Sequence, residues 1–194
     1  WGHGNEGSIV NVSIQGHNAK ASVKDGKWTA VLPPLTASES EELTLNDGVD
    51  SIVVANIAVG EVWIAGGQSN MEFPLRNLRE YRSIRNTNQP LIRLYGVPRI
   101  SYKGQMEDDD FSEYRIWRPC TPENLWFYSG APYYFAMMLY QKYGIPIGIL
   151  NCNYGGTRAS SWSDRSILEK TRARIWIDEY EQNVKELDID KYTE

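Results

Sequence analysis

The sequence predicts an α/β protein in two parts: a small antiparallel β-sandwich over residues 1–58, and a domain over 59–194 whose parallel sheet is covered by helices. Two observations support this prediction. Before Gly60, short apolar segments recur about every ten residues, separated by turn residues and without helical periodicity, which is typical of antiparallel β-structure. After Gly60, short apolar runs alternate with segments of helical period, which is typical of parallel sheets.

Composition limits the classes of protein that the chain can represent. Its 194 residues are 41% hydrophobic and 23% charged, as expected for a folded protein with a core. The formal net charge is −5 and no basic cluster occurs, which argues against nucleic acid as the main partner. No apolar run approaches the roughly 18 residues needed to span a bilayer, so no membrane span is expected. The two cysteines could form one disulfide or none, and they cannot provide the usual four ligands of a zinc site.

The strands expected in the first part follow from local patterns. Residues 8–14 alternate apolar and polar side chains with the period of a half-buried strand. Asp25-Gly26 is a strong signal for a tight turn, and residues 27–32 are expected to form the returning strand. Two further strands are expected at 42–45 and 51–59, with a turn at 46–48 between them.

The second part of the sequence shows a different spacing of apolar residues. Residues 131–143 repeat apolar side chains at helical spacing and stop before Gly144 and Pro146, a usual end for a helix. Residues 165–187 form a charged amphipathic segment that is also expected to be helical. Short apolar runs predict buried strands at 62–65, 92–97 and 145–151. If the sheet stops after 145–151, it would expose an apolar edge, which soluble proteins avoid.

The loop after the strand at 62–65 is the first candidate site. A glycine pair at 66–67 precedes Ser69, and such glycines allow a sharp turn that leaves a serine hydroxyl and its own N–H facing outward. A nucleophilic serine needs this geometry, because the N–H can stabilise the oxyanion that its attack creates. The sequence differs from the G-x-S-x-G elbow, since Met71 replaces the second glycine. Taken alone, the pattern favours a helix N-cap formed by Ser or Asn.

The loop at 153–157 is the second candidate site, and it contains Gly155 and Gly156. Taken alone, this glycine pair is typical of a turn, although it could also offer a backbone N–H to an anion. A serine nucleophile needs a base, but the two histidines, His3 and His17, lie in the expected sandwich. If Ser69 is a nucleophile, its base is therefore expected from outside these 194 residues.

Three blocks of this sequence resemble the sialate O-acetylesterase family of SGNH (GDSL-like) hydrolases. They are residues 60–72, which contain Gly-Gly-Gln-Ser-Asn-Met, residues 117–124, and residues 145–157 followed by Trp162. Their order and spacing match the family across most of 60–165, and the strand-rich 1–58 is similar to a small sandwich that precedes the hydrolase domain in many members. The resemblance implies a three-layer α/β/α SGNH domain, of which 59–194 would be the first part.

The resemblance also implies an activity, the removal of O-acetyl groups from carbohydrate, above all from sialic acid. Ser69 would attack the acetyl carbonyl, and its N–H, together with that of Gly155 or Gly156, would form part of the oxyanion hole. No metal or organic cofactor is implied. The family's remaining oxyanion Asn and its base lie in Q-G-E-x-N and D-x-x-H blocks that do not occur here. A further polypeptide segment carrying the catalytic His and Asp is therefore expected, and residues 1–194 alone are expected neither to fold stably nor to hydrolyse esters.

Four residues are candidates for contact with the sugar. Gln68 and Asn70 could hydrogen-bond substrate or brace the Ser69 turn. Arg158 could pair with a carboxylate such as that of sialic acid, or remain solvated. Trp162 could stack on a sugar ring or belong to the core. Members of the family often carry Glu-Ala before this tryptophan, where the present sequence has two serines.

Two alternatives remain open at this point. The motifs predict the reaction better than the sugar, so the chain could act on acetylxylan or another polysaccharide. It could also be a carbohydrate-binding module on a hydrolase scaffold without catalysis. The family resemblance implies a secreted, periplasmic or lysosomal protein, although the sequence shows no secretory leader.

Overall fold

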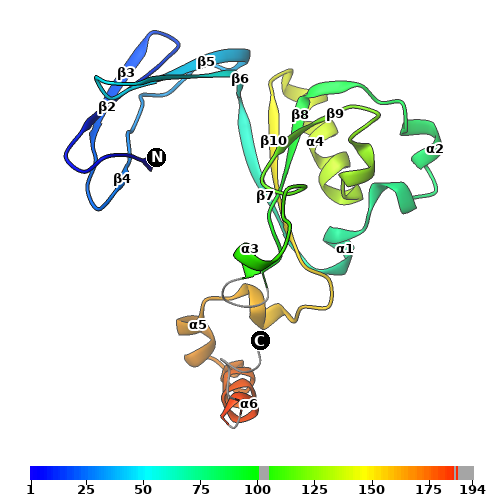
Figure 1. Ribbon diagram of the computed structural model, residues 1–194. Helices are drawn as coiled ribbons and strands as arrows, with labels where there is room; N and C mark the ends of the chain where they lie inside the picture. Colours follow the sequence, from blue (N-terminus) through cyan, green and yellow to red (C-terminus); the bar gives the residue numbers. More distant parts are fainter. Residues whose placement is uncertain (101–104, 186, 188–194) are drawn as a thin grey trace.

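The computed structural model describes residues 1–100, 105–185 and 187, and Figure 1 shows two sheet-based parts that meet where β6 runs into β7. The first part is antiparallel: a four-stranded sheet has the order β3-β2-β5-β6, and β1 pairs with β4 in a two-stranded ribbon. Its strands are β1 (Gly2–His3), β2 (Ile9–Ile14), β3 (His17–Ser22), β4 (Lys27–Trp28), β5 (Ser38–Asn46) and β6 (Ser51–Val59).

Trp28 connects the ribbon to the four-stranded sheet. Its ring packs in a small core with Val10 and Val12 of β2, Ala21 of β3, and Val23. The antiparallel prediction is confirmed, but the second layer of the expected sandwich consists of the β1–β4 ribbon. The strand expected at 27–32 ends at Trp28, because β4 pairs with the two residues of β1 and not with a long neighbour.

Two tight turns shape the four-stranded sheet and the ribbon. Asp25 and Gly26 have φ values of 53° and 70°, the left-handed pair that a type I′ turn requires, so the expected turn is present. Gln15 and Gly16 have φ values of 50° and 73° and connect β2 to β3 in the same way. The strand β3 was not expected from the sequence, because Gln-Gly is not one of the residue pairs that commonly mark this turn.

The second part contains a mixed sheet in the order β7-β10-β8-β9. The strands are β7 (Glu61–Gly67), β8 (Gln89–Gly96), β9 (Trp117–Cys120) and β10 (Ile147–Asn153). The strand β10 is parallel to both β7 and β8, while β9 is antiparallel to β8. The prediction that the strand at 145–151 would form an exposed apolar edge of the sheet is therefore wrong, because β10 lies between β7 and β8. The edge strand is β7, and on the face opposite Trp63 its Val62 and Ile64 side chains are 59% and 73% exposed.

Gly60 joins the two sheets, and its position allows no side chain. A Cβ atom added there would lie 2.0 Å from the carbonyl oxygen of Pro146, which also accepts the N–H of Glu61 at 3.1 Å. From β8, Arg93 reaches back to β6 and donates to the backbone oxygen and to Oδ1 of Asn56, both at 2.7 Å. These contacts hold β6 next to the amino ends of the parallel strands.

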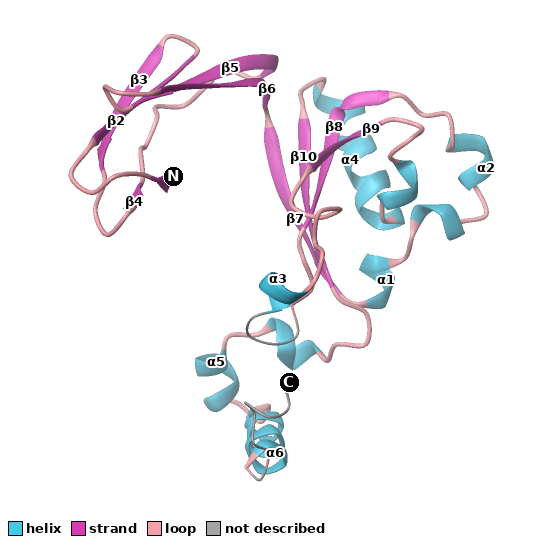
Figure 2. Cartoon of the chain, viewed as in Figure 1, coloured by secondary structure: helices cyan, strands magenta, loops and turns pink. Residues whose placement is uncertain are grey.

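One long helix, α4 (Gly130–Tyr143), packs on β8 and β10 (Figure 2), and its Phe135 ring meets Trp63 of β7 edge-on at 5.2 Å. It ends at Gly144, whose φ of 66° is the expected left-handed cap. The other helices are α1 (Ser69–Glu72), η1 (Leu75–Asn77), α2 (Tyr81–Ile84), α3 (Gln105–Asp108), η2 (Leu125–Phe127), η3 (Ala159–Trp162), α5 (Arg165–Glu169) and α6 (Arg174–Val184). None of the described helices is both long and apolar enough to cross a bilayer.

The helical segment expected at 165–187 is divided into α5 and α6. Between them the Thr171 hydroxyl accepts the N–H of Ala173, so a local side-chain bond competes with continuation of the helix. The core of the second part lies between α4 and the sheet and includes Ile92, Leu94, Ile147 and Ile149. The mixed α/β architecture expected from the sequence is thus confirmed.

Both cysteines are free: Cys120 is fully buried on β9, and Cys152 is partly buried on β10. Burial raises the pKa of the Cys120 thiol to about 12. At pH 8 only about 10⁻⁴ of this thiol would be ionised. Iodoacetamide is therefore expected to leave Cys120 unmodified in the folded protein and to modify it after denaturation, as measured by mass spectrometry of the peptides. Equal modification rates in both states would show that the thiol is accessible.

Candidate active site

Ser69 lies directly after β7, in a turn that requires glycine. Gly67 has a φ of 149°, a value that side-chain-bearing residues rarely adopt, and a Cβ atom there would lie 3.1 Å from Met71 Cβ. After this turn, Ser69 is the first residue of the one-turn helix α1, and it is exposed. The sequence therefore presents the serine at the carboxyl end of a sheet strand, where α/β proteins commonly place their sites.

Gln68 braces this serine. Its Oε1 atom accepts the backbone N–H of Ser69 at 3.1 Å and the Ser69 hydroxyl at 3.0 Å. Its backbone oxygen accepts the N–H groups of Met71 and Glu72 at 2.9 Å each. The N-cap is therefore Gln68 and not Ser69 or Asn70, which corrects the simple capping interpretation. Of the two roles considered for Gln68, bracing is the one that the contacts support.

The structure brings the two candidate loops together. Because β7 and β10 are neighbouring parallel strands with Gly67 opposite Asn153, their loops leave the sheet side by side. The backbone N–H of Tyr154 donates to the oxygen of Gly67 at 2.9 Å. A Cβ atom added to Gly155 would lie 3.8 Å from Ser69 Cα. The glycine loop is thus adjacent to the serine.

The three backbone amides considered for an oxyanion hole differ in their partners. The N–H of Ser69 donates to Gln68, as described above, and the N–H of Gly155 donates to Oε2 of Glu72 at 2.5 Å. Gly156 has a φ of 83°, and its N–H has no hydrogen-bond acceptor within the part of the chain that the structure describes. Gly156 therefore offers an amide that could bind an oxygen anion without displacing a protein acceptor.

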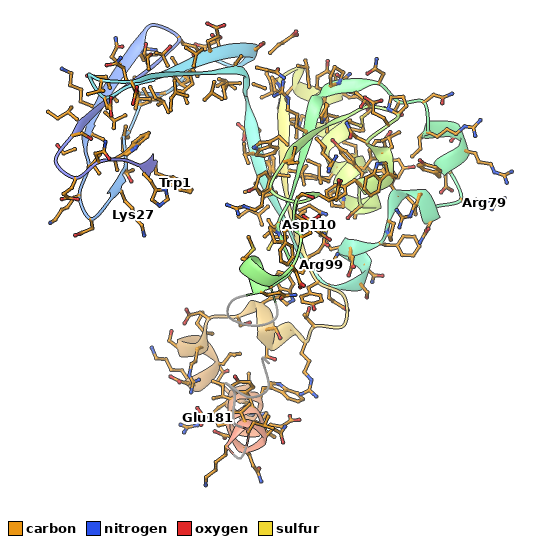
Figure 3. All side chains as sticks on the ribbon, viewed as in Figure 1. Trp1, Lys27, Arg79, Arg99, Asp110 and Glu181 are labelled. Carbon is orange, nitrogen blue, oxygen red and sulfur yellow. The ribbon has the colours of Figure 1, made fainter. Side chains whose placement is uncertain are left out.

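Glu72 and Arg99 also belong to the site, although neither was expected from the sequence as a site residue. Nη1 of Arg99 lies 2.7 Å from Oε1 of Glu72, and the same guanidinium donates to the backbone oxygen and to Oδ1 of Asn153 at 3.1 and 3.3 Å. Figure 3 places Arg99 at the end of the sheet away from Trp1 and Lys27 of the first part. The sequence offered two signals for Glu72: it ends the block 60–72, and its position three residues after Ser69 places it near the serine on one turn of helix.

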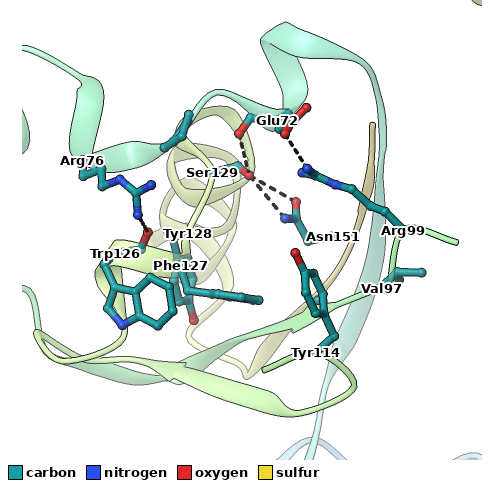
Figure 4. Close-up of a pocket in the computed structure, with 12 residues that line it drawn as sticks. Glu72, Arg76, Val97, Arg99, Tyr114, Trp126, Phe127, Tyr128, Ser129 and Asn151 are labelled. Atoms are coloured by element: carbon teal, nitrogen blue, oxygen red, sulfur yellow. Dashed lines mark hydrogen bonds and ion pairs between the residues drawn. The ribbon is translucent and has the colours of Figure 1, made fainter. Parts of the chain in front are cut away.

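A cavity of about 230 Å³ opens beside this ion pair (Figure 4). Its walls include Glu72, Arg76, Arg99, Tyr114, Trp126 and Asn151. Arg76 donates to the backbone oxygen of Trp126 at 3.2 Å, which holds one aromatic wall of the cavity in place. The cavity combines aromatic rings with polar side chains, a lining that suits a polar ring such as a sugar.

The other predicted substrate residues are dispersed around the serine. Nε1 of Trp162 donates to Oγ1 of Thr157 at 2.8 Å, and its ring edge would lie 3.6 Å from a Cβ atom on Gly66. Asn70 is exposed and lines a separate hollow with Phe73. The structure therefore places Trp162, but not Asn70, against the backbone of the turn that leads to Ser69.

Arg158 contacts helix α6. Its Nη1 atom pairs with Oε2 of Glu179 at 3.1 Å, and the guanidinium lies 4.7 Å from the ring centre of Trp176. His3 and His17 are exposed in the first part, on β1 and β3. Across residues 1–100, 105–185 and 187, no group of three or more His, Cys, Asp or Glu side chains is arranged to hold a metal ion.

No protein-family model matches the chain. Sialate O-acetylesterases of Mus musculus and Homo sapiens are 28% and 29% identical to it, over 87% of this chain but only 34% and 36% of their own lengths. A crystal structure of a carbohydrate acetylesterase from Xanthomonas citri superposes with a TM-score of 0.73 and 25% identity, covering 88% of this chain and 39% of that one. The chain thus spans about a third of the length of the curated relatives. It is a distant homologue of the sialate O-acetylesterases, matched over part of their length.

Proposed function

We propose that this chain carries the nucleophile and part of the oxyanion hole of a serine esterase that removes O-acetyl groups from carbohydrate. The observation that carries the proposal is the meeting of Ser69 with the glycine loop at the ends of β7 and β10. An exposed serine next to a loop whose Gly156 N–H has no acceptor within the described residues supplies two of the groups that acyl transfer needs, a nucleophile and an oxyanion donor. The relationship to carbohydrate esterases supports the same chemistry.

The proposed reaction has two steps. Ser69 Oγ attacks the acetyl carbonyl, the sugar hydroxyl leaves, and an acetyl-serine forms; water then attacks this ester and releases acetate. The Gly156 N–H would bind the oxyanion of each tetrahedral intermediate. The Ser69 N–H could join it once the Gln68 side chain turns away, because Gln68 Oε1 now accepts that N–H.

A general base is needed for the first step. The acceptor that holds the Ser69 hydroxyl is the amide oxygen of Gln68, which cannot take up its proton at neutral pH. We therefore propose that a further polypeptide segment supplies the His, the Asp and an oxyanion Asn, and that it completes a three-layer SGNH domain beside the exposed edge of β7. A secreted, periplasmic or lysosomal location is proposed with it.

The substrate proposed first is O-acetylated sialic acid, since the curated relatives are sialate O-acetylesterases. The Xanthomonas citri relative is described as a carbohydrate acetylesterase, and this favours acetylxylan or another acetylated polysaccharide as the second candidate. A module that binds carbohydrate without catalysis is the remaining alternative from a different class.

The proposal is tested by measuring the acetate that the full-length protein releases from acetylated sugars. We expect kcat/KM for O-acetylated sialic acid to exceed that for acetylated xylan by at least about tenfold, a difference of about 1.4 kcal/mol in transition-state binding. The reverse preference would assign the protein to polysaccharide deacetylation. Calorimetric binding of either sugar without any acetate release would instead show a binding module.

A further inference from the structure

We propose that Glu72 is a positioning residue of this site: its two carboxylate oxygens hold the glycine loop against the helix that carries Ser69. This inference rests on the proposed esterase function and assigns a role to a residue that, among the described residues, makes no hydrogen bond to the Ser69 hydroxyl or the Gly156 N–H. Glu72 acts through Gly155, which directly precedes Gly156 in the chain.

Each carboxylate oxygen of Glu72 has its own partner. Oε1 pairs with Arg99, from the loop after β8, and Oε2 accepts the N–H of Gly155, from the loop after β10. The side chains of Glu72 and Arg99 are 28% and 34% exposed, so both are partly shielded from water. An ion pair alone would not require the second oxygen to bind a neutral peptide N–H. Glu72 therefore holds the glycine loop in addition to neutralising the charge of Arg99.

A closed ring of hydrogen bonds supports this arrangement. Arg99 donates to Asn153, whose Nδ2 donates to Asn151 Oδ1 at 2.6 Å. Nδ2 of Asn151 donates to Ser129 Oγ at 3.3 Å, and Ser129 Oγ donates to the backbone oxygen of Glu72 at 3.3 Å. Figure 4 shows Glu72, Arg99, Ser129 and Asn151 facing one another. The ring connects α1, the start of α4 and the ends of β8 and β10.

The space around Gly155 shows how closely the loop fits Glu72. A Cβ atom added to Gly155 would lie 2.4 Å from Oε2 of Glu72. The φ of Gly155 is not in the left-handed region, so a side chain at this position would displace the Glu72 carboxylate without straining the backbone conformation. Because Glu72 occupies the Gly155 amide, the Gly156 amide is the one left for substrate, and its position depends on where Glu72 holds the loop.

The test is Glu72→Gln in the full-length protein. Glutamine replaces one of the two acceptor oxygens with an NH2 group, so it cannot accept hydrogen bonds from Arg99 and Gly155 at the two positions that these residues occupy. We expect kcat for acetate release to fall by about 10- to 100-fold, with KM within about threefold, because a small displacement of a catalytic group affects the chemical step. In hydrogen exchange, the peptide over residues 151–158 should lose protection while the unfolding midpoint stays near that of the wild type.

Glu6→Gln is the matched control. Glu6 Oε2 also accepts a glycine N–H, that of Gly26 at 3.1 Å, but it lies in the first part of the chain. This variant should leave kcat and the exchange of 151–158 unchanged. A comparable fall in kcat for Glu6→Gln would show that the effect is not specific to the site.

The outcomes separate this inference from the proposed function. If Ser69→Ala is inactive and Glu72→Gln retains wild-type kcat, the role of Glu72 is overturned and the esterase proposal stands. If Ser69→Ala remains active, the esterase proposal fails, and the exchange of residues 151–158 still decides whether Glu72 holds the loop. A fall in kcat accompanied by an equal loss of protection throughout the protein would mean that Glu72 serves stability only, which also overturns the inference.

Discussion

Ser69→Ala in the full-length protein is expected to lower kcat/KM for acetyl ester hydrolysis by about four orders of magnitude or more. The alanine removes the atom that forms the acyl-enzyme, and the hydroxyl of Ser69 is exposed next to the glycine loop, where an ester could reach it. Steady-state acetate release measures this loss. Covalent labelling by a fluorophosphonate should disappear in the same variant.

Ser22→Ala provides the control for that experiment, because Ser22 is an exposed serine on β3 in the first part of the protein. It should keep wild-type kcat/KM and full labelling. Labelling that persists in Ser69→Ala, at a peptide other than 69, would assign the nucleophile to another serine. Activity that survives in Ser69→Ala would remove the basis of the proposed mechanism.

Gly60→Ala is expected to cause the largest loss of stability, about 3 kcal/mol in the free energy of unfolding. Its Cβ atom would lie 2.0 Å from the Pro146 carbonyl oxygen, a backbone atom that cannot move unless β7 and β10 separate. Urea denaturation followed by tryptophan fluorescence measures the change, since Trp63 lies on β7.

The matched control for stability is Gly66→Ala, near the carboxyl end of β7, the strand that Gly60 precedes. There a Cβ atom would meet only ordinary contacts, 3.6 Å from the oxygen of Cys152 and from the Trp162 ring. We expect the free energy of unfolding to change by less than about 1 kcal/mol. Similar losses for both variants would show that Gly60 is not specially constrained by Pro146.

The site depends on the strand order as much as on its residues. Ser69 and Gly155 are far apart in the sequence, and they meet because β10 pairs directly with β7. The same pairing lets Glu72 reach the Gly155 amide, and the pairing of β10 with β8 brings Asn153 to Arg99. A single central strand therefore assembles both sides of the site.

Local patterns were sufficient to predict most of the elements and the position of the serine. The alternation at 8–14, the Asp25-Gly26 turn and the apolar spacing at 131–143 each depend on neighbours within a few residues, and the structure confirms them as β2, a left-handed turn and α4. The sharp turn at the glycine pair before Ser69 could also be predicted from the sequence, because the unusual φ at Gly67 is a property of the local backbone.

The remaining features were decided only by tertiary structure. The central place of β10, the short return strand β4 and the requirement for glycine at position 60 all depend on which distant strand lies alongside. The partners of Glu72 likewise come from two other loops, at Arg99 and Gly155. Local sequence specifies the spacing of apolar side chains along a segment and the turns that end the segment. The choice between neighbours is made by the burial of apolar faces and the pairing of polar groups once all strands are in place.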